Sequence, residues 1–249
     1  MSPRRALVSG ASKGIGRAVT LALAAEGHHV VALGRDPEAL AKLQRDADGD
    51  VRTIVCDVTD EPAVVSTVDG LDGVDILVNN VGTGPSAPLH RTELSTWDDA
   101  LRTNATSSFL LTRAVVPRMR AAGWGRIVFV ASTASLRGAP YIAAYVASKH
   151  AQLGLMRAVA AELAGSGVTS NAVCPTYVRT PMTDASIARI VDKTGRTAAQ
   201  AQDALVEGSA LGRLLEPDEV AAAVRYLVSD EAGCVNGAAL VLDGGGSTL

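Results

Sequence analysis

Short apolar runs alternate with longer stretches of helical spacing along most of the chain. The apolar runs with the length of strands are residues 6–8, 29–33, 53–56, 75–78, 126–130, 169–173 and 239–242. The helix-length stretches between them are residues 14–26, 37–47, 61–68, 94–121, 141–164 and 217–229. This alternation is typical of repeated βαβ units. It predicts one α/β domain over residues 1–249, a doubly wound Rossmann-type fold with a seven-stranded parallel sheet and helices on both faces.

Residues 181–215 break this alternation. The segment is polar and rich in alanine and threonine, and its apolar spacing fits one or two amphipathic helices without a strand. Ligands bind at the carboxyl ends of the strands in such a sheet, so the segment is predicted to be a small helical substrate lid. A helical hairpin without a role in binding is the alternative that the pattern leaves open.

Composition narrows the class of protein. The 249 residues are 47% hydrophobic and 20% charged, and the formal net charge is -3, which favours a folded core and argues against a nucleic-acid partner. The three cysteines, Cys56, Cys174 and Cys234, are too far apart in sequence to form a CxxC pair or an evident disulfide framework. No apolar run approaches the roughly 20 residues of a membrane helix, and residues 1–5 lead directly into a strand without room for a signal peptide. We therefore expect a cytoplasmic protein without a membrane partner.

A glycine-rich turn follows the first predicted strand and opens the first predicted helix. It reads Gly10-Ala11-Ser12-Lys13-Gly14-Ile15-Gly16. Glycine lets the backbone approach a pyrophosphate closely, and the free N–H groups of a helix start favour an anion there. The spacing differs from the GxGxxG of many dinucleotide folds, so a turn without a ligand remains the alternative reading of this segment alone.

The end of the second predicted strand bears on the cofactor. An NAD site presents an acid to the ribose 2′-hydroxyl here, whereas an NADP site presents a cation to the 2′-phosphate. The predicted strand ends at Leu33 without an acid, Gly34 and Arg35 follow, and Lys13 of the glycine turn could approach the same phosphate. This predicts NADP(H) in preference to NAD(H). Two alternatives stay open: the two cations are ordinary surface charges, or Asp36 contacts a ribose.

Several separated motifs agree with one enzyme family. Residues 9–16 are similar to a TGxxxGIG turn, with Ser9 in place of threonine, and residues 79–82 are similar to NNAG, with Val81 in place of alanine. Tyr145 begins a YxxxK motif, and Ser132 stands thirteen residues before it. Through these motifs the chain resembles the short-chain dehydrogenase/reductase family over nearly its whole length.

The resemblance implies roles for further residues. Asn104 matches the helix asparagine of the family, and residues 242–245 are similar to a closing segment that packs in a tetramer. Residues 171–180 resemble the NxVxPGxxxT segment that holds the nicotinamide, with Thr176 in place of glycine. Asp57 and Val58 match the adenine contact. The predicted cofactor-binding residues are Gly10, Ser12, Lys13, Gly14, Ile15, Gly16, Arg35, Asp57, Val58, Asn80, Gly82, Tyr145, Lys149, Pro175, Val178 and Thr180.

The YxxxK motif can carry acid–base chemistry. Tyr145 and Lys149 are four residues apart on a predicted helix, so their side chains share one face. A free tyrosine has a pKa of about 10, and a nearby ammonium favours the phenolate, so we expect Lys149 to lower the pKa of Tyr145 and make it a usable acid or base. Ser132 would hydrogen-bond the same substrate oxygen. By resemblance, Lys149 also binds the nicotinamide ribose, and Asn104 supports a water that links Lys149 to solvent.

Other catalytic chemistries find no support in the sequence. No GxSxG elbow surrounds Ser132, so a nucleophilic serine is not indicated. The four histidines, His28, His29, His90 and His150, are scattered without ligand spacing, so no metal site is expected. Each residue of the predicted site would alone fit a structural role, and it is their combination at these spacings that favours catalysis.

The leading hypothesis is an NADPH-dependent carbonyl reductase that converts a ketone to a secondary alcohol. The resemblance is strongest to reductases of 3-oxoacyl thioesters and polyketide ketones, so the expected substrate is a 3-oxoacyl thioester or a polyketide-like ketone, and a CoA or carrier-protein thioester is one form it could take. The substrate pocket is expected to be formed by residues 133–141, residues 83–90 and the lid. Arg137 in the first of these segments could attract an anionic group of the substrate, or it could be an ordinary solvated arginine. One alternative is an NAD(P)-dependent 3-hydroxyacyl-CoA or hydroxy-acid dehydrogenase, and another is a dinucleotide-sensing binding protein without turnover. The resemblance also implies a homotetramer.

Overall fold

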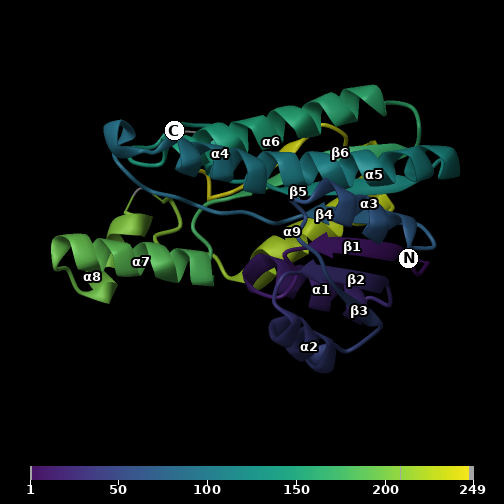
Figure 1. The fold of residues 1–249 in the computed structure, drawn as a ribbon, viewed down its shortest axis with the longest axis horizontal. Coiled ribbons are helices and arrows are strands. Elements are labelled where there is room, and N and C mark those ends of the chain that lie inside the picture. Colours follow the sequence, from purple (N-terminus) through teal and green to yellow (C-terminus); the bar gives the residue numbers. More distant parts are fainter. Residues whose placement is uncertain (1, 208, 247–249) are drawn as a thin grey trace.

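A parallel sheet forms the centre of the molecule (Figure 1). The computed structural model describes residues 2–207 and 209–246, so residues 1, 208 and 247–249 of the predicted domain lie outside the described residues. The sheet has seven strands in the order β3-β2-β1-β4-β5-β6-β7, and all neighbours are parallel. The strands are β1 (Arg5–Ser9), β2 (His29–Gly34), β3 (Val51–Val55), β4 (Ile76–Asn79), β5 (Gly125–Val130), β6 (Val168–Pro175) and β7 (Ala239–Leu242). The predicted α/β fold class is confirmed.

Helices cover both faces of the sheet (Figure 1). The main helices are α1 (Gly14–Ala25), α2 (Pro37–Asp46), α3 (Glu61–Asp69), α4 (Leu94–Leu101), α5 (Ser107–Ala122), α6 (Ala143–Glu162), α7 (Pro181–Thr194), α8 (Ala198–Val206) and α9 (Pro217–Val228). The buried side chains of α1, α2 and α9 join one hydrophobic cluster, and those of α3, α5 and α6 join a second. The sheet is therefore a buried layer between two helical layers, as a doubly wound fold requires.

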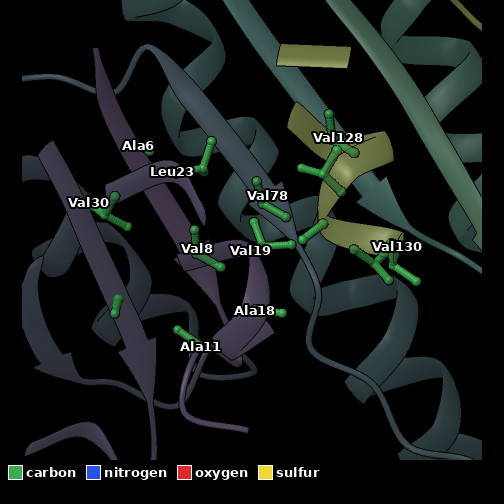
Figure 2. Packing of buried hydrophobic residues seen from close by; sticks show 14 of the residues in the cluster. Ala6, Val8, Ala11, Ala18, Val19, Leu23, Val30, Val78, Val128 and Val130 are labelled. Carbon is green, nitrogen blue, oxygen red and sulfur yellow. The ribbon is translucent and has the colours of Figure 1, made fainter. Parts of the chain in front are cut away.

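Alternation along each strand supplies both cores. Ala6 and Val8 of β1 face the first cluster, whereas Leu7 between them faces the second. Figure 2 shows this packing on the first side, where Val19 of α1 lies against the sheet near Val8 and Val78. Successive strand side chains point to opposite faces, so a strand buried on both sides needs a nearly continuous apolar run. This is the reason that short apolar runs marked the central strands in the sequence.

The helix expected at residues 94–121 is interrupted. A π-helical turn, Arg102–Thr106, separates α4 from α5. Asn104 lies within this turn and is fully buried. Single π-turns inside helices occur frequently at functional sites. The prediction of one regular helix was therefore wrong at this point, because a π-turn leaves the apolar pattern on both sides intact.

The helix expected at residues 141–164 begins two residues later, at Ala143. Tyr141 has a φ of 67°, in the left-handed region, where a helix cannot continue. Its backbone oxygen accepts a hydrogen bond from the Ala87 N–H at 2.8 Å, which ties this turn to the loop after β4.

Residues 181–215 contain α7 and α8 and form no strand within their described part; residue 208 lies outside the described residues. Thr180 caps α7, because its side chain accepts a hydrogen bond from the Thr183 N–H at 3.4 Å. Gly195 ends the helix with a φ of 70°. The two helices project from the body of the molecule in Figure 1. Their role as a lid remains a prediction.

Candidate active site

One large cavity lies at the carboxyl ends of the parallel strands, where ligands of open α/β sheets bind. Its volume is about 1690 Å³, which exceeds the roughly 300–1,000 Å³ of a typical small-molecule pocket. A dinucleotide and a substrate would therefore fit together. The predicted residues that line it are Gly10, Ser12, Lys13, Gly14, Ile15, Arg35, Asp57, Val58, Asn80, Gly82, Ser132, Tyr145, Lys149, Pro175, Val178 and Thr180. Gly16 and Asn104 are not among the lining residues.

The glycine turn is held against the end of β4. Gly10 has a φ of 63° and Gly14 a φ of 52°, so both use the left-handed conformation that glycine tolerates. The Asn80 side-chain amide donates to the Ser9 backbone oxygen at 2.9 Å and to that of Gly10 at 3.1 Å. Gly16 lies behind the turn, where its α-carbon packs against Gly10 and Asn80. Asn80 and Gly16 thus fix the shape of the turn from behind.

The turn fits a dinucleotide pyrophosphate. Lys13 is the N-cap residue of α1, and its side chain makes no capping hydrogen bond. The first turn of α1 also contains no acidic residue. The backbone N–H groups at this helix start are therefore not satisfied by a capping side chain, and they face a cavity where a phosphate would be favoured. The residues present fit the cofactor that the motifs imply.

The end of β2 presents cations to the same cavity. The Arg35 side chain is 80% exposed and lies 4.0 Å from the Asp57 carboxylate. Asp36 is occupied otherwise: one carboxylate oxygen accepts from the Ala39 N–H at 3.0 Å, and the other contacts the Lys13 ammonium at 3.1 Å. The hydrogen bond from the Ala39 N–H lowers the pKa of Asp36 most, and the contact with Lys13 lowers it further. Asp36 therefore serves as the N-cap of α2, and Arg35 is the more available group.

Ser132, Tyr145 and Lys149 come together at the ends of β5 and α6. The Tyr145 side chain has a hydrogen bond with that of Ser132. Ser132 begins the short 3-10 helix η3 (Thr133–Ser135), and its hydroxyl accepts from the Ala134 N–H at 3.1 Å. The Lys149 ammonium is 6.0 Å from the centre of the Tyr145 ring and donates to the Val130 backbone oxygen at 2.9 Å. The structure thus brings the three side chains together in the wall of one cavity, and their catalytic roles remain a prediction.

The ionisation of this site differs from the sequence expectation. Burial raises the pKa of Tyr145, and its hydrogen bond with Ser132 only partly offsets that effect. Burial also lowers the pKa of Lys149 to about 8. The expectation that Lys149 lowers the pKa of Tyr145 was wrong for this arrangement, because removal from water is the largest effect on Tyr145 and Lys149 is not among the groups that shift its pKa. Tyr145 is therefore protonated at neutral pH and can act as an acid.

Asn104 supports the site from behind. Its side-chain nitrogen donates to the Thr83 backbone oxygen at 3.0 Å and to the Ser148 hydroxyl at 2.7 Å, and its side-chain oxygen accepts from the Thr83 N–H at 2.7 Å. A Cβ at Gly82 would lie 3.3 Å from this amide oxygen and 3.6 Å from the Lys149 nitrogen. The absence of a side chain at Gly82 therefore lets the cavity reach toward both groups.

Sequence reasoning missed several residues of the site. Tyr177 and Met182 line the cavity near α7, and Arg189 of α7 donates to the Gly84 backbone oxygen at 3.3 Å. Gln152 accepts a hydrogen bond from Lys149 at 2.9 Å. A polar residue three positions after Lys149, on the same helical face, was the available signal for Gln152. The others depend on where α7 folds back, which local patterns do not reveal.

Comparisons with known proteins agree with this geometry. A sequence model of a family described as enoyl-(acyl carrier protein) reductase matches residues 10–247. A 3beta-hydroxysteroid dehydrogenase from Mediterraneibacter gnavus is 38% identical, over 97% of this chain and 94% of the relative. The chain belongs to the short-chain dehydrogenase/reductase family. An acetoacetyl-CoA reductase from Shinella zoogloeoides is a further relative of this kind, 34% identical over 97% of this chain and 98% of its own.

A solved structure extends the comparison to the fold. The crystal structure of a variant of the actinorhodin polyketide ketoreductase with NADPH has a TM-score of 0.95 and 34% sequence identity. The match covers 99% of this chain and 98% of the ketoreductase. As a short-chain dehydrogenase/reductase, the protein is an NAD(P)-binding oxidoreductase that acts on CH–OH and C=O groups, which confirms the predicted enzyme class. Its activity is that of a carbonyl reductase or a hydroxy dehydrogenase.

Two features outside the cavity would bear on further partners, a membrane-spanning helix and a metal-binding cluster. Among the described residues, no helix is long and apolar enough to cross a membrane. In the same part of the chain, no three histidine, cysteine, aspartate or glutamate side chains gather in a way that could hold a metal ion.

Proposed function

We propose that this protein is an NADPH-dependent ketoreductase that acts on 3-oxoacyl thioesters or polyketide-like ketones. The observation that carries the proposal is the Tyr145–Ser132 pair in the wall of the cavity. Because burial raises the pKa of Tyr145, its hydroxyl keeps the proton that a ketone needs on reduction. Alcohol oxidation would instead require this group to lose its proton.

The cofactor would be held along the length of the cavity. The start of α1 and the glycine turn would bind its pyrophosphate, and Asp57 and Val58 would contact its adenine. Asn80, Gly82, Pro175, Val178 and Thr180 would line the nicotinamide end, and Lys149 would bind its ribose. When bound, the reduced nicotinamide supplies a hydride to the carbonyl carbon.

The residues of the chain supply the remaining chemistry. Tyr145 donates its proton to the carbonyl oxygen as that oxygen gains negative charge. Ser132 hydrogen-bonds the same oxygen and holds it near Tyr145. Lys149, cationic below its pKa of about 8, stabilises the phenolate that remains. Asn104 is hydrogen-bonded to the Thr83 backbone and to Ser148 of α6, so it holds the loop and the helix together. It would also support a water that returns the proton to Tyr145.

A thioester substrate is supported by charge at the cavity. Arg189 and Lys193 of α7 and Arg137 after η3 all line it, and among the described residues neither Arg137 nor Arg189 forms an ion pair with an acidic side chain. Lys193 lies 3.7 Å from Asp192 in a fully solvated pair. The phosphates of CoA or of a carrier-protein arm would be attracted there. The acetoacetyl-CoA reductase and polyketide ketoreductase among the relatives support the same class.

The preference for NADPH rests on the end of β2. Arg35 is exposed beside the cavity, and Asp36, the acid that follows it, is engaged as a helix cap. NADPH accompanies the related polyketide ketoreductase. We further propose that the whole chain acts as one catalytic domain with residues 181–215 as its lid, that it forms a homotetramer, and that it is cytoplasmic, where its free cysteines would stay reduced.

The proposal is tested by mixing the protein with NADPH and acetoacetyl-CoA and following the loss of nicotinamide absorbance. Turnover is expected, and Tyr145→Phe should reduce kcat by about a hundredfold or more, the usual contribution of a general acid. NADPH binding, measured by fluorescence in the same variant, should be retained. A parent protein that binds NADPH but reduces neither this thioester nor simple ketones would refute the reductase and favour a binding protein.

A hydroxy dehydrogenase is the second candidate, because a hydroxysteroid dehydrogenase is among the relatives. Tyr145 would then act as the base, which its raised pKa disfavours at neutral pH. Faster oxidation of a 3-hydroxyacyl thioester than reduction of its ketone at neutral pH would favour this candidate.

A further inference from the structure

Gln152 forms the end of a buried polar chain behind the catalytic residues. It lies on α6, one turn after Lys149, and it is fully buried. Its side-chain oxygen accepts a hydrogen bond from the Lys149 ammonium at 2.9 Å. Its side-chain nitrogen donates to the Ser108 hydroxyl at 2.9 Å. Both ends of the amide are therefore used.

The chain continues from Gln152 to the π-helical turn. Ser108 is buried at the start of α5, and its hydroxyl donates to the Asn104 backbone oxygen at 3.0 Å. The Asn104 side chain in turn contacts Ser148 of α6. Two independent routes, one through Ser108 and one through Ser148, thus connect the turn with the helix that carries Lys149. An amide flip of Gln152 would break both of its hydrogen bonds, so the network fixes its orientation.

Lys149 depends on Gln152 because few other groups balance its charge. Its side chain is 4% exposed. No ion pair of Lys149 occurs among the described residues, and the titratable groups that face it are Tyr145 on the same helix and Cys174 on β6. Its hydrogen-bond acceptors in the described structure are the Val130 backbone oxygen and Gln152. An ammonium has three N–H donors, so one remains for the cavity side.

We propose that Gln152 is a positioning residue of the reduction: it holds the Lys149 ammonium charged and in place, and it couples that ammonium to the π-turn that carries Asn104. Hydrogen bonds to charged groups are about twice as strong as neutral ones. Of the two acceptors, the Val130 oxygen belongs to the sheet, whereas Gln152 is a side chain that can be changed without altering the backbone. The inference rests on the proposed reductase function only for its kinetic part.

The experiment compares Gln152→Met with Gln152→Glu. Methionine keeps the length of the side chain without the amide, and glutamate puts a carboxylate in the same place. The chain has four lysines, Lys13, Lys42, Lys149 and Lys193, so carbon-13 labelling of lysine gives few signals, and the Lys149 signal is assigned by its loss in Lys149→Met. We expect the pKa of Lys149 to fall by about one unit in Gln152→Met and to rise by a similar amount in Gln152→Glu.

The kinetic readout should follow the same signs. In Gln152→Met, the alkaline limb of kcat/KM for ketone reduction should move to lower pH, and kcat at neutral pH should fall about tenfold. In Gln152→Glu the limb should move to higher pH. If Gln152 had a purely structural role, the alkaline limb would not move in opposite directions in the two variants. Ser170→Ala is the matched control, because the Ser170 hydroxyl is buried and donates to the Met156 backbone oxygen of α6 at 3.0 Å without touching Lys149.

Ser170→Ala should leave the Lys149 titration unchanged. If Gln152→Met fails to fold, as shown by thermal unfolding, Gln152→Glu carries the test alone. A Lys149 pKa in folded Gln152→Glu equal to that of the parent would overturn the proposal, and so would a shift of equal sign in both variants. If the parent reduces no ketone, the proposed function fails, but the titration in the free protein still decides the role of Gln152.

Discussion

Gly16 offers a sharp test of how the phosphate turn is built. Its backbone dihedrals are ordinary for a helix residue, since no left-handed φ occurs there, so alanine is permitted by backbone conformation. A Cβ at this position, however, would overlap the Gly10 backbone oxygen and the Asn80 side-chain amide. It would lie 2.9 Å from the Gly10 carbonyl carbon, about 0.6 Å inside the shortest favourable carbon–carbon separation of roughly 3.5 Å.

The expected effect of Gly16→Ala follows from this overlap. Overpacking at a rigid backbone contact costs about 1–3 kcal/mol, and the better helix propensity of alanine offsets about 1 kcal/mol of it. The net loss of stability is therefore about 0–2 kcal/mol, which lowers Tm by several degrees at most in a protein of this size. The turn must move to relieve the contact, and a pyrophosphate would lose at least one charge-assisted hydrogen bond. NADPH binding should weaken about ten- to a hundredfold.

NADPH fluorescence titration and thermal unfolding measure the two effects separately. Gly154→Ala is the matched control, because Gly154 is also helical and no atom lies within 4 Å of its hypothetical Cβ. This control should raise stability by up to about 1 kcal/mol and leave NADPH affinity unchanged. A folded Gly16→Ala protein that binds NADPH like the parent would refute the argument that this glycine sets the shape of the turn.

Three further predictions follow from other parts of the site and core. Arg35→Asp should lower the ratio of kcat/KM with NADPH to that with NADH by tenfold or more, because an anion replaces the cation at the proposed 2′-phosphate site. Steady-state rates with both cofactors give the ratio, and an unchanged ratio would show that Arg35 does not select the cofactor. The kcat/KM for reduction should fall as pH rises above about 8, since Lys149 loses its charge there. A kcat/KM that stays unchanged up to pH 10 would contradict the role given to the Lys149 charge. Phe129→Ala should cost about 3–5 kcal/mol, measured by urea unfolding, because Phe129 is fully buried in the second core; a loss below about 1 kcal/mol would show that the core refills the cavity.

The accuracy of the strand prediction depends on how continuous the apolar run of each strand is. Central strands such as β4 and β5 are buried on both faces, and their apolar runs gave positions close to the observed ones. β3 is an edge strand with exposed positions, and its observed start at Val51 is two residues before the expected one. Arg52 and Thr53 occupy it because one side of an edge strand meets solvent. The other edge strand, β7, is only partly buried but apolar throughout, and it was predicted at its observed bounds, so an unbroken apolar run is what locates a strand in the sequence.

The motif residues of the candidate site were predictable as neighbours, whereas their electrostatics were not. Motif spacing placed Ser132, Tyr145 and Lys149 together because helical periodicity and strand ends are local properties. Their pKa values depend on how many atoms surround them, which is a property of the assembled layers. The π-turn around Asn104 and the contact of Gln152 with Ser108 likewise need the packing of α5 against α6. Local patterns therefore predict that the motif residues meet, and packing determines how they ionise and which other residues reach them.

The two buried ionisable groups together bear on the direction of the reaction. Burial stabilises the neutral form of each, so Tyr145 retains its proton well into the alkaline range while Lys149 loses its own at about pH 8. Reduction uses the protonated phenol, the form that predominates at neutral pH. Oxidation uses the phenolate, which must form against the burial penalty and is helped only while Lys149 is still charged. Since these two requirements overlap poorly, the oxidative rate should have a narrower pH range than the reductive rate, which pH profiles of the two directions would measure.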